Sequence, residues 1–175
     1  MKNIKLSATL FFSFLFIPGY ISYPQQSNLE NFKFLIGEWV GTGGGSNSGQ
    51  GGGASIFRFD LDSNVIVREN YANYPAQNNN PEYTHRDLMI IYYQSTTPKS
   101  VYFDNEKHAI NYNIEFVDNK VIFTSEEVKG VPQFKLTYEK EGNNKMKLYF
   151  DIAPPNAPGK FVSYLTAEIH KKPAQ

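Results

Sequence analysis

The sequence contains no cysteine and has no excess of charge of either sign. Without cysteine, neither disulfide bonds nor lipid attachment through a cysteine is available, so stability must come from the packed core. Lys and Arg together number 17, and Asp and Glu also number 17. This balance gives no electrostatic field that would attract a polyanion, and we expect no nucleic-acid partner.

Long apolar runs are also missing. The longest, Leu6 to Ile17, is shorter than the ~20 residues that span a bilayer. Because Lys2 and Lys5 precede it and Pro18-Gly19 ends it, we predict a signal peptide over residues 1–22, cut between 19 and 27. A retained membrane anchor is the alternative. Cleavage would leave a net charge of −2 on a periplasmic or secreted domain over residues 28–172 without stable membrane insertion.

Residues typical of catalytic and metal sites are scarce. The three histidines, His85, His108 and His170, lie far apart, so no local metal-binding spacing exists, although distant strands can converge in the fold. No Gly-x-Ser-x-Gly motif is present. We predict neither catalytic residues nor metal ligands.

Glycine is concentrated in one place. Eight of the 13 glycines lie between Gly41 and Gly53. The stretch from Gly49 to Ala54 fits a loose dinucleotide-binding pattern, but a strand pattern follows it where a helix is required. We predict a flexible hairpin loop, with a lid over a barrel mouth as its functional form.

Upstream of the glycines the sequence predicts a short helix. Asn28 can cap it, Gly37 can end it, and its apolar face would consist of Phe32, Leu35 and Ile36.

Apolar and polar residues alternate over most of the remaining chain. The clearest case is His108 to Phe116, where Ile110, Tyr112 and Ile114 share one face. Further strands are predicted over 38–42, 55–61, 65–74, 88–93, 100–104, 121–126, 133–139, 145–152 and 161–170.

These strands number about ten and are joined by short links, which favours antiparallel neighbours. Since no helices are predicted to cover a second face, the fold class is all-β, either a sandwich or a barrel. We favour a single antiparallel meander β-barrel with a short N-terminal helix, because closure removes both open edges and ten strands enclose a ligand-sized interior.

Charged residues interrupt two of the strands. Arg68 and Glu69 are candidates for an internal polar site, but a bulge that turns both to solvent is slightly favoured. Arg86 and Asp87 are predicted to form an ion pair at a strand end, with a polar cluster at the barrel mouth as the functional alternative.

Gly37, Trp39 and Gly41, followed by the meander, resemble the opening of the calycin superfamily of lipocalins, fatty-acid-binding proteins and nitrobindins. In that superfamily the tryptophan closes one end of the barrel. Residues 59–76, 85–93 and 101–112 resemble uncharacterised bacterial lipocalin-like proteins related to the DUF1579 group. The resemblance covers most of residues 32–170; it implies a lipocalin-like barrel and assigns no activity.

Nitrobindins bind a b-type haem through a histidine on the last strand, and their opening motif is matched by Gly37, Trp39, Gly41 and Gly43. This chain departs at the other end. Its last strand carries only His170, beside the terminal lysines, while the inward positions are expected at Ser163, Leu165, Ala167 and Ile169. We therefore expect no cofactor, and haem is the alternative that the resemblance raises.

The resemblance and the aromatic-rich inward faces together predict an exported, monomeric or weakly dimeric barrel that binds a small hydrophobic molecule. Trp39 would close the base, and Arg68 and His108 would supply polar contacts. The predicted ligand-binding residues are Trp39, Phe57, Phe59, Arg68, His108, Tyr112, Tyr138 and Phe150. Two alternatives remain: an enzyme acting on a lipid-like or tetrapyrrole ligand with His108 as acid or base, and a filled barrel that acts as an envelope interaction module.

Overall fold

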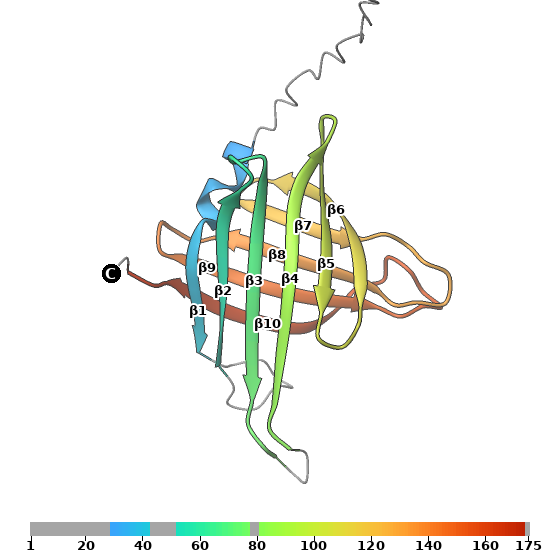
Figure 1. The fold of residues 1–175 in the computed structure, drawn as a ribbon. Coiled ribbons are helices and arrows are strands. Elements are labelled where there is room, and N and C mark those ends of the chain that lie inside the picture. Colours follow the sequence, from blue (N-terminus) through green and yellow to red (C-terminus); the bar gives the residue numbers. More distant parts are fainter. Residues whose placement is uncertain (1–28, 43–51, 78–80, 174–175) are drawn as a thin grey trace, which may run out of the picture.

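The computed structural model describes residues 29–42, 52–77 and 81–173. Within these residues, ten antiparallel strands form one closed barrel, in which each strand pairs with its neighbours in chain order (Figure 1). The strands are β1 (Gly37–Thr42), β2 (Gly52–Asp60), β3 (Val65–Tyr74), β4 (Tyr83–Gln94), β5 (Thr97–Asp104), β6 (Ala109–Val117), β7 (Lys120–Ser125), β8 (Gln133–Lys140), β9 (Lys145–Ala153) and β10 (Val162–Lys171). This confirms the predicted all-β meander barrel.

The first and last strands close the ring. Trp39 lies opposite Lys171 and Gly41 lies opposite Ile169 in the β1–β10 pair. The register of β10 shifts once, between Ser163 and Leu165, where it pairs with β9. Because β1 and β10 pair with each other, the sheet of the described residues has no open edge, which is the physical advantage of a barrel over a sandwich.

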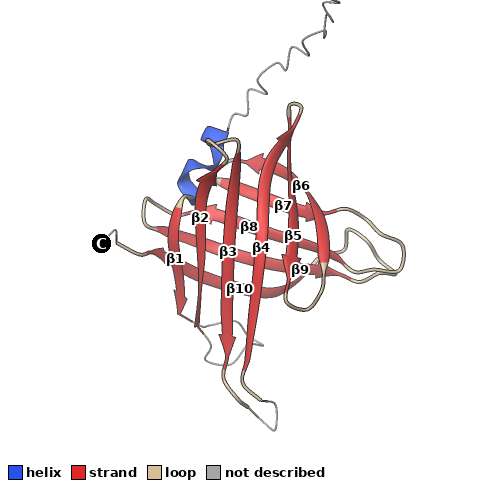
Figure 2. Cartoon of the chain, in the orientation of Figure 1, coloured by secondary structure: helices blue, strands red, loops and turns tan. Residues whose placement is uncertain are grey.

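A 3₁₀ helix, η1 (Leu29–Leu35), lies at one end of the barrel, and β1 and β3 end at the opposite end (Figure 2). Its buried residues are Leu29, Phe32 and Leu35, a spacing of three that matches the three residues per turn of this helix type. Phe32 makes an edge-on contact with Phe116. The predicted helix is therefore present. Its third buried residue is Leu29, whereas Ile36, which was expected on the apolar face, is only partly buried.

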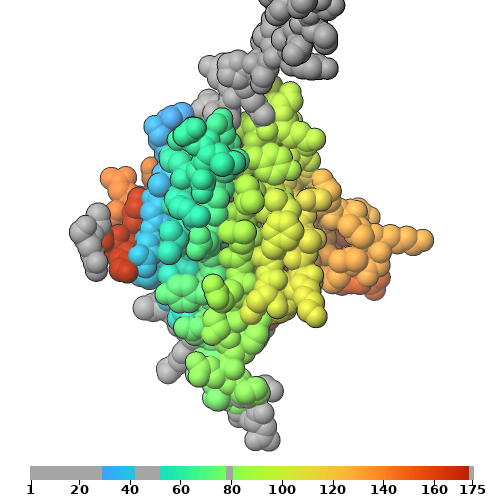
Figure 3. Space-filling model, viewed as in Figure 1, coloured from blue at the N-terminus to red at the C-terminus, as the bar shows by residue number. Residues whose placement is uncertain are grey.

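Inward side chains fill the half of the barrel next to η1. Phe57, Ile66 and Ile91 are at most 1% exposed and belong to one core cluster with the helix. Packed apolar residues thus fill the interior near η1, and a cavity lies further along the strands. On the outside, Figure 3 shows the side chains of β2 to β6 packed side by side over one face.

Some predictions fall outside the described residues. The signal peptide and Asn28 precede residue 29, and most of the glycine-rich segment lies in residues 43–51. The described residues contain no helix with the length and apolarity needed to cross a membrane.

Candidate functional site

The half of the barrel away from η1 contains a cavity of about 600 Å³. This volume is within the ~300–1,000 Å³ of typical small-molecule pockets and far above the ~30 Å³ of one water molecule in the liquid. The filled-barrel alternative required a cavity no larger than a few water molecules, and the structure does not meet that condition.

One wall of the cavity is apolar and comes from the last three strands. It consists of Phe134, Leu136, Leu148, Phe150, Ile152, Leu165, Ala167 and Ile169. Phe134 and Phe150 are stacked, with their ring centroids 6.0 Å apart. Such a wall can hold the apolar part of a ligand without offering it a hydrogen bond.

The opposite wall is polar and includes the buried charged residue Arg68 of β3. The Arg68 side chain is 4% exposed, forms an ion pair with Asp87 and donates from Nη1 to the hydroxyl of Tyr138 at 2.8 Å. Burial alone would raise the pKa of Asp87, but the charge of Arg68 and hydrogen bonds from His85, Arg68 and Asn70 hold it below its ordinary value. Both charges are thus retained inside the barrel.

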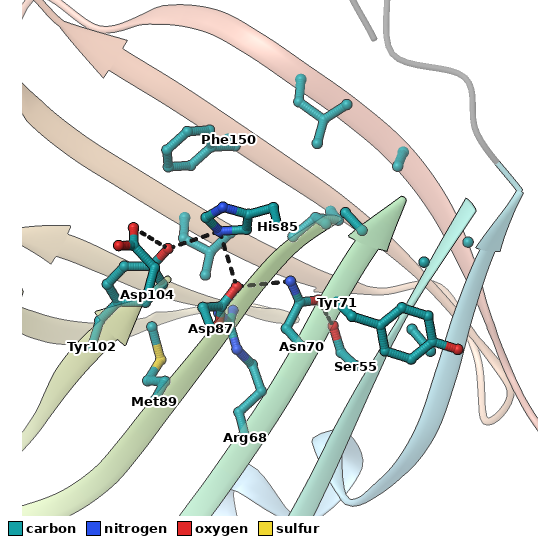
Figure 4. Close-up of a pocket in the computed structure, with 18 of the residues that line it drawn as sticks. Ser55, Arg68, Asn70, Tyr71, His85, Asp87, Met89, Tyr102, Asp104 and Phe150 are labelled. Carbon is teal, nitrogen blue, oxygen red and sulfur yellow. Dashed lines mark hydrogen bonds and ion pairs between the residues drawn. The ribbon is translucent and has the colours of Figure 1, made fainter. Parts of the chain in front are cut away.

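Two polar side chains extend this network along β3 and β2. Asn70 donates from Nδ2 to Oδ2 of Asp87 at 2.8 Å, and Ser55 donates from Oγ to Oδ1 of Asn70 at 2.6 Å. Figure 4 shows these side chains pointing toward one another from adjacent strands. Asp87 consequently has partners on both carboxylate oxygens, as a buried charge requires.

His85 of β4 lies nearer the open end and uses both ring nitrogens. Its Nε2 lies 3.1 Å from the hydroxyl of Tyr102 and 3.5 Å from Oδ2 of Asp87, and its Nδ1 lies 3.2 Å from Oε1 of Glu106. The hydrogen bond to Asp87, followed by that to Glu106, raises the pKa of His85 despite its partial burial.

Asp104 ends β5 on the same side of the cavity. Its Oδ2 accepts from Tyr102 at 3.1 Å and lies 2.7 Å from Nδ1 of His108, while its Oδ1 accepts from the backbone N–H groups of Glu106 and His108, both at 2.9 Å. Burial alone would raise the pKa of Asp104, but the hydrogen bonds from the backbone and side chain of His108 and from Tyr102 lower it. The carboxylate is therefore ionised and faces the barrel interior.

The structure brings most of the predicted ligand-binding residues to the cavity and leaves two elsewhere. Phe57 is 1% exposed and contacts Tyr138 edge-on in the filled half, and Phe59 packs partly buried against the core. The cavity-lining residues among those predicted are Trp39, Arg68, His108, Tyr112, Tyr138 and Phe150. Their ligand contacts remain predictions.

His108 differs from the expectation that it begins an apolar face. Its side chain is 55% exposed and pairs with Asp104, whereas Tyr112 and Ile114 of the same strand are buried. The strand β6 starts one residue later, at Ala109, so His108 belongs to the connection between β5 and β6.

The favoured bulge near Arg68 is wrong. The β2–β3 pairing runs without a shift from Gly52–Asn73 to Asp60–Val65. Regular alternation therefore turns Arg68 inward, where Asp87 neutralises it, and turns Glu69 outward, where it pairs with Arg58 at 2.7 Å. The predicted Arg86–Asp87 ion pair is also wrong, because Asp87 pairs with Arg68 across the β3–β4 interface and Arg86 is exposed.

Sequence reasoning did not identify Ser55, Asn70, Asp104 and Glu106 as site residues, and it considered His85 only for local metal-binding spacing. It placed Asp87 at the barrel mouth only as the alternative to an ion pair with Arg86. The strand β4 begins at Tyr83, five residues before its predicted start at Leu88. Period-2 spacing of His85, Asp87 and Met89 was the available signal, and it was obscured because the inward face is polar there.

Comparisons with known proteins support the architecture. No family model matches the chain, and no curated protein matches it in sequence. A crystal structure of Rv2717c from M. tuberculosis is similar with a TM-score of 0.58 and 11% identity, over 83% of this chain and 97% of that one. At this identity the similarity shows the fold alone; the ten-strand barrel is consistent with a calycin-like fold, and the relation to the DUF1579 group stays a prediction.

The last strand bears on the haem alternative. Leu165, Ala167 and Ile169 of β10 line the cavity, as expected for inward positions. The inward position expected at Ser163 is wrong: Ser163 is exposed and Tyr164 lines the cavity, because the register shifts between Ser163 and Leu165. His170 is 53% exposed and lies 3.0 Å from Glu168. Its side chain therefore points to the outer face of β10, and His170 is not among the cavity-lining residues.

Proposed function

We propose that the protein is an exported carrier or sensor that binds a small amphipathic molecule in the barrel. The apolar part of the ligand lies against β8 to β10, and its polar end meets the network on β3 to β5. The cavity of about 600 Å³ with these two unlike walls is the observation that carries the proposal. Cavities of this kind bury most of a ligand by apolar contact and orient it with a few polar groups.

The polar wall favours particular ligand groups. Tyr102 and Asn70 can each offer a donor or an acceptor, while Asp87, Asp104 and Glu106 outnumber the permanent cation Arg68. A hydroxyl or amine group therefore suits this wall better than a carboxylate, which would meet like charge. The part of the ligand that meets the apolar wall of β8 to β10 must itself be apolar, so a sugar or nucleotide fits this cavity less well.

Export rests on Lys2, Lys5 and the apolar run that follows them. We propose a monomer or weak dimer in the periplasm or outside the cell. Measuring the mass of the protein recovered from that compartment would locate the cleavage site, and an uncleaved membrane-bound chain would contradict the proposal.

Native mass spectrometry of the chain from about residue 28, with a visible spectrum of the same sample, tests the function first. Extra mass removed by denaturation would support the carrier and identify the class of ligand. A Soret band would instead show bound haem and support the haem alternative.

A cavity-filling variant tests the location. Ala167 lines the cavity, whereas its neighbour Thr166 is exposed on the outer face of the same strand. Ala167→Trp should weaken binding of the neutral fluorescent probe N-phenyl-1-naphthylamine at least tenfold, and Thr166→Trp should leave it unchanged. Equal affinity in both variants, or no probe binding by the unmodified protein, would overturn the proposal.

A further inference from the structure

Three metal-ligating side chains converge at the edge of the cavity from segments that show no metal-binding spacing in the sequence. His85 comes from β4, Asp104 ends β5 and Glu106 lies in the turn that follows. One possible ligand atom from each lies within 4.8 Å of the others. An imidazole nitrogen with two carboxylate oxygens is a donor set that binds zinc, manganese and related divalent cations.

The charges around this cluster are not balanced. Asp87 has the permanent cation Arg68, whereas Asp104, whose side chain is 3% exposed, has an ion pair with His108 alone among the described residues. Glu106 likewise has an ion pair with His85 and with no lysine or arginine in the described part of the chain. The Asp104 carboxylate, which is buried without a permanent cation, favours a cation beside it.

The neighbours of the cluster also orient it. With Nδ1 of His85 beside Glu106, its Nε2 lies 3.5 Å from Oδ2 of Asp87, and Arg68 and Asn70 hold that carboxylate in turn. A histidine ligand commonly has such a carboxylate at its other nitrogen, which fixes the direction of the ring. The hydroxyl of Tyr83 donates to Glu106 at 2.7 Å and holds the third side chain.

We infer that His85, Asp104 and Glu106 bind one divalent transition-metal cation, of the zinc or manganese class, at the edge of the cavity. Three protein ligands leave a further coordination position on the ion. His108, 2.7 Å from Asp104, lies beside the site as a partner of one ligand. The inference does not depend on the amphipathic ligand, since the three side chains belong to the protein alone.

Calorimetric titration of the untagged protein with zinc chloride, after removal of metal by EDTA, tests the inference near neutral pH. We expect saturable binding of one Zn²⁺ per chain. Glu106→Gln and Asp104→Asn should each weaken it at least about tenfold, the scale on which metal sites respond to changes in their ligand sphere. Glu106 is 46% exposed, so its variant keeps the test valid if Asp104→Asn is poorly folded.

The matched control is a histidine–carboxylate pair outside the cavity, Glu168 and His170, on the outer face of β10. Glu168→Gln with His170→Gln should leave zinc affinity unchanged. Absence of saturable binding, or affinity that the control lowers while the cluster variants do not, would overturn the inference. Probe binding measured in EDTA reports the proposed carrier function separately, so either idea can fail without the other.

Discussion

Asp87 and Asp104 lie directly opposite each other on β4 and β5, and both side chains are 3% exposed on the inner face of the barrel. Like charges in such a cross-strand position destabilise a sheet unless other groups compensate. The two carboxylates are compensated differently: Arg68 neutralises Asp87, while hydrogen bonds from the backbone, Tyr102 and His108 satisfy Asp104. Of these two carboxylates, Asp87 is therefore paired with a permanent cation and Asp104 is not.

Neutralising each aspartate should have unequal effects. Asp87→Asn leaves the buried guanidinium of Arg68 without its counter-charge, and we expect a loss of about 3 kcal/mol or more in the free energy of unfolding. Asp104→Asn keeps an acceptor for the backbone donors and removes a like charge, so a change within about 1 kcal/mol is expected. Urea unfolding of both variants checks this; equal losses would show that Arg68 does not distinguish the two carboxylates.

Acid should remove the contribution of the Arg68–Asp87 pair. Because the pKa of Asp87 is lower in the folded chain than in the unfolded one, its stabilisation is present above the unfolded pKa of about 3.9 and is lost as the pH falls through the folded value. The stability difference between the unmodified chain and Asp87→Asn should therefore shrink as the pH falls below about 4. Because the hydrogen bond to Asp87 also raises the pKa of His85, a second part of the difference is present below the unfolded pKa of His85, about 6.5, and is lost as the pH rises through its folded value. A difference that already shrinks as the pH falls from about 6 to about 5 would contradict both assignments.

The order and pairing of the strands could be predicted because the signals are local. Alternation marks each strand, and short links force antiparallel neighbours, as the pair β8–β9 illustrates with its Gly142–Asn144 turn. The register of β3 followed the same rule, and the error at Arg68 arose from assuming that an arginine would avoid the interior. A buried partner for it, Asp87, is 19 residues away and leaves no local signal.

Sequence-based prediction was limited, second, by the position of each residue along the barrel axis. Alternation shows that Phe57 faces inward, but it does not show whether that level of the barrel is filled or hollow. The answer depends on η1, whose Phe32 and Leu35 occupy one end and leave the cavity at the other. The convergence of Arg68 with Tyr138, 70 residues apart, likewise follows from closure of the whole ring.

Gly53 should be intolerant of a side chain. A Cβ atom at this position would overlap the carbonyl oxygen of Tyr71 on the neighbouring strand β3. Gly53→Ala must therefore displace backbone, and we expect a loss of about 1–3 kcal/mol in unfolding free energy.

The adjacent Gly52 provides a matched control, because a Cβ there would meet the oxygen of Gly41 at an ordinary 3.8 Å. Gly52→Ala should change stability by no more than about 0.5 kcal/mol. Thermal unfolding of the two variants gives the comparison, and similar losses at both positions would indicate that the β2–β3 backbones can move apart freely.

Trp39 should stabilise the closed end of the barrel through its indole N–H as well as its volume. The side chain is 1% exposed, and Nε1 donates to the carbonyl oxygen of Leu35, the last residue of η1, at 2.6 Å. Trp39→Phe leaves that buried carbonyl without its partner and removes part of the ring system, so a loss of about 2–4 kcal/mol in unfolding free energy is expected.

Leu35→Met is the control, because it retains the carbonyl and nearly the same volume and should cost less than about 1.5 kcal/mol. Circular dichroism is the suitable measurement, since the variant lacks the only tryptophan of the chain. If Trp39→Phe costs no more than Leu35→Met, the hydrogen bond from β1 to η1 does not hold the helix on the barrel.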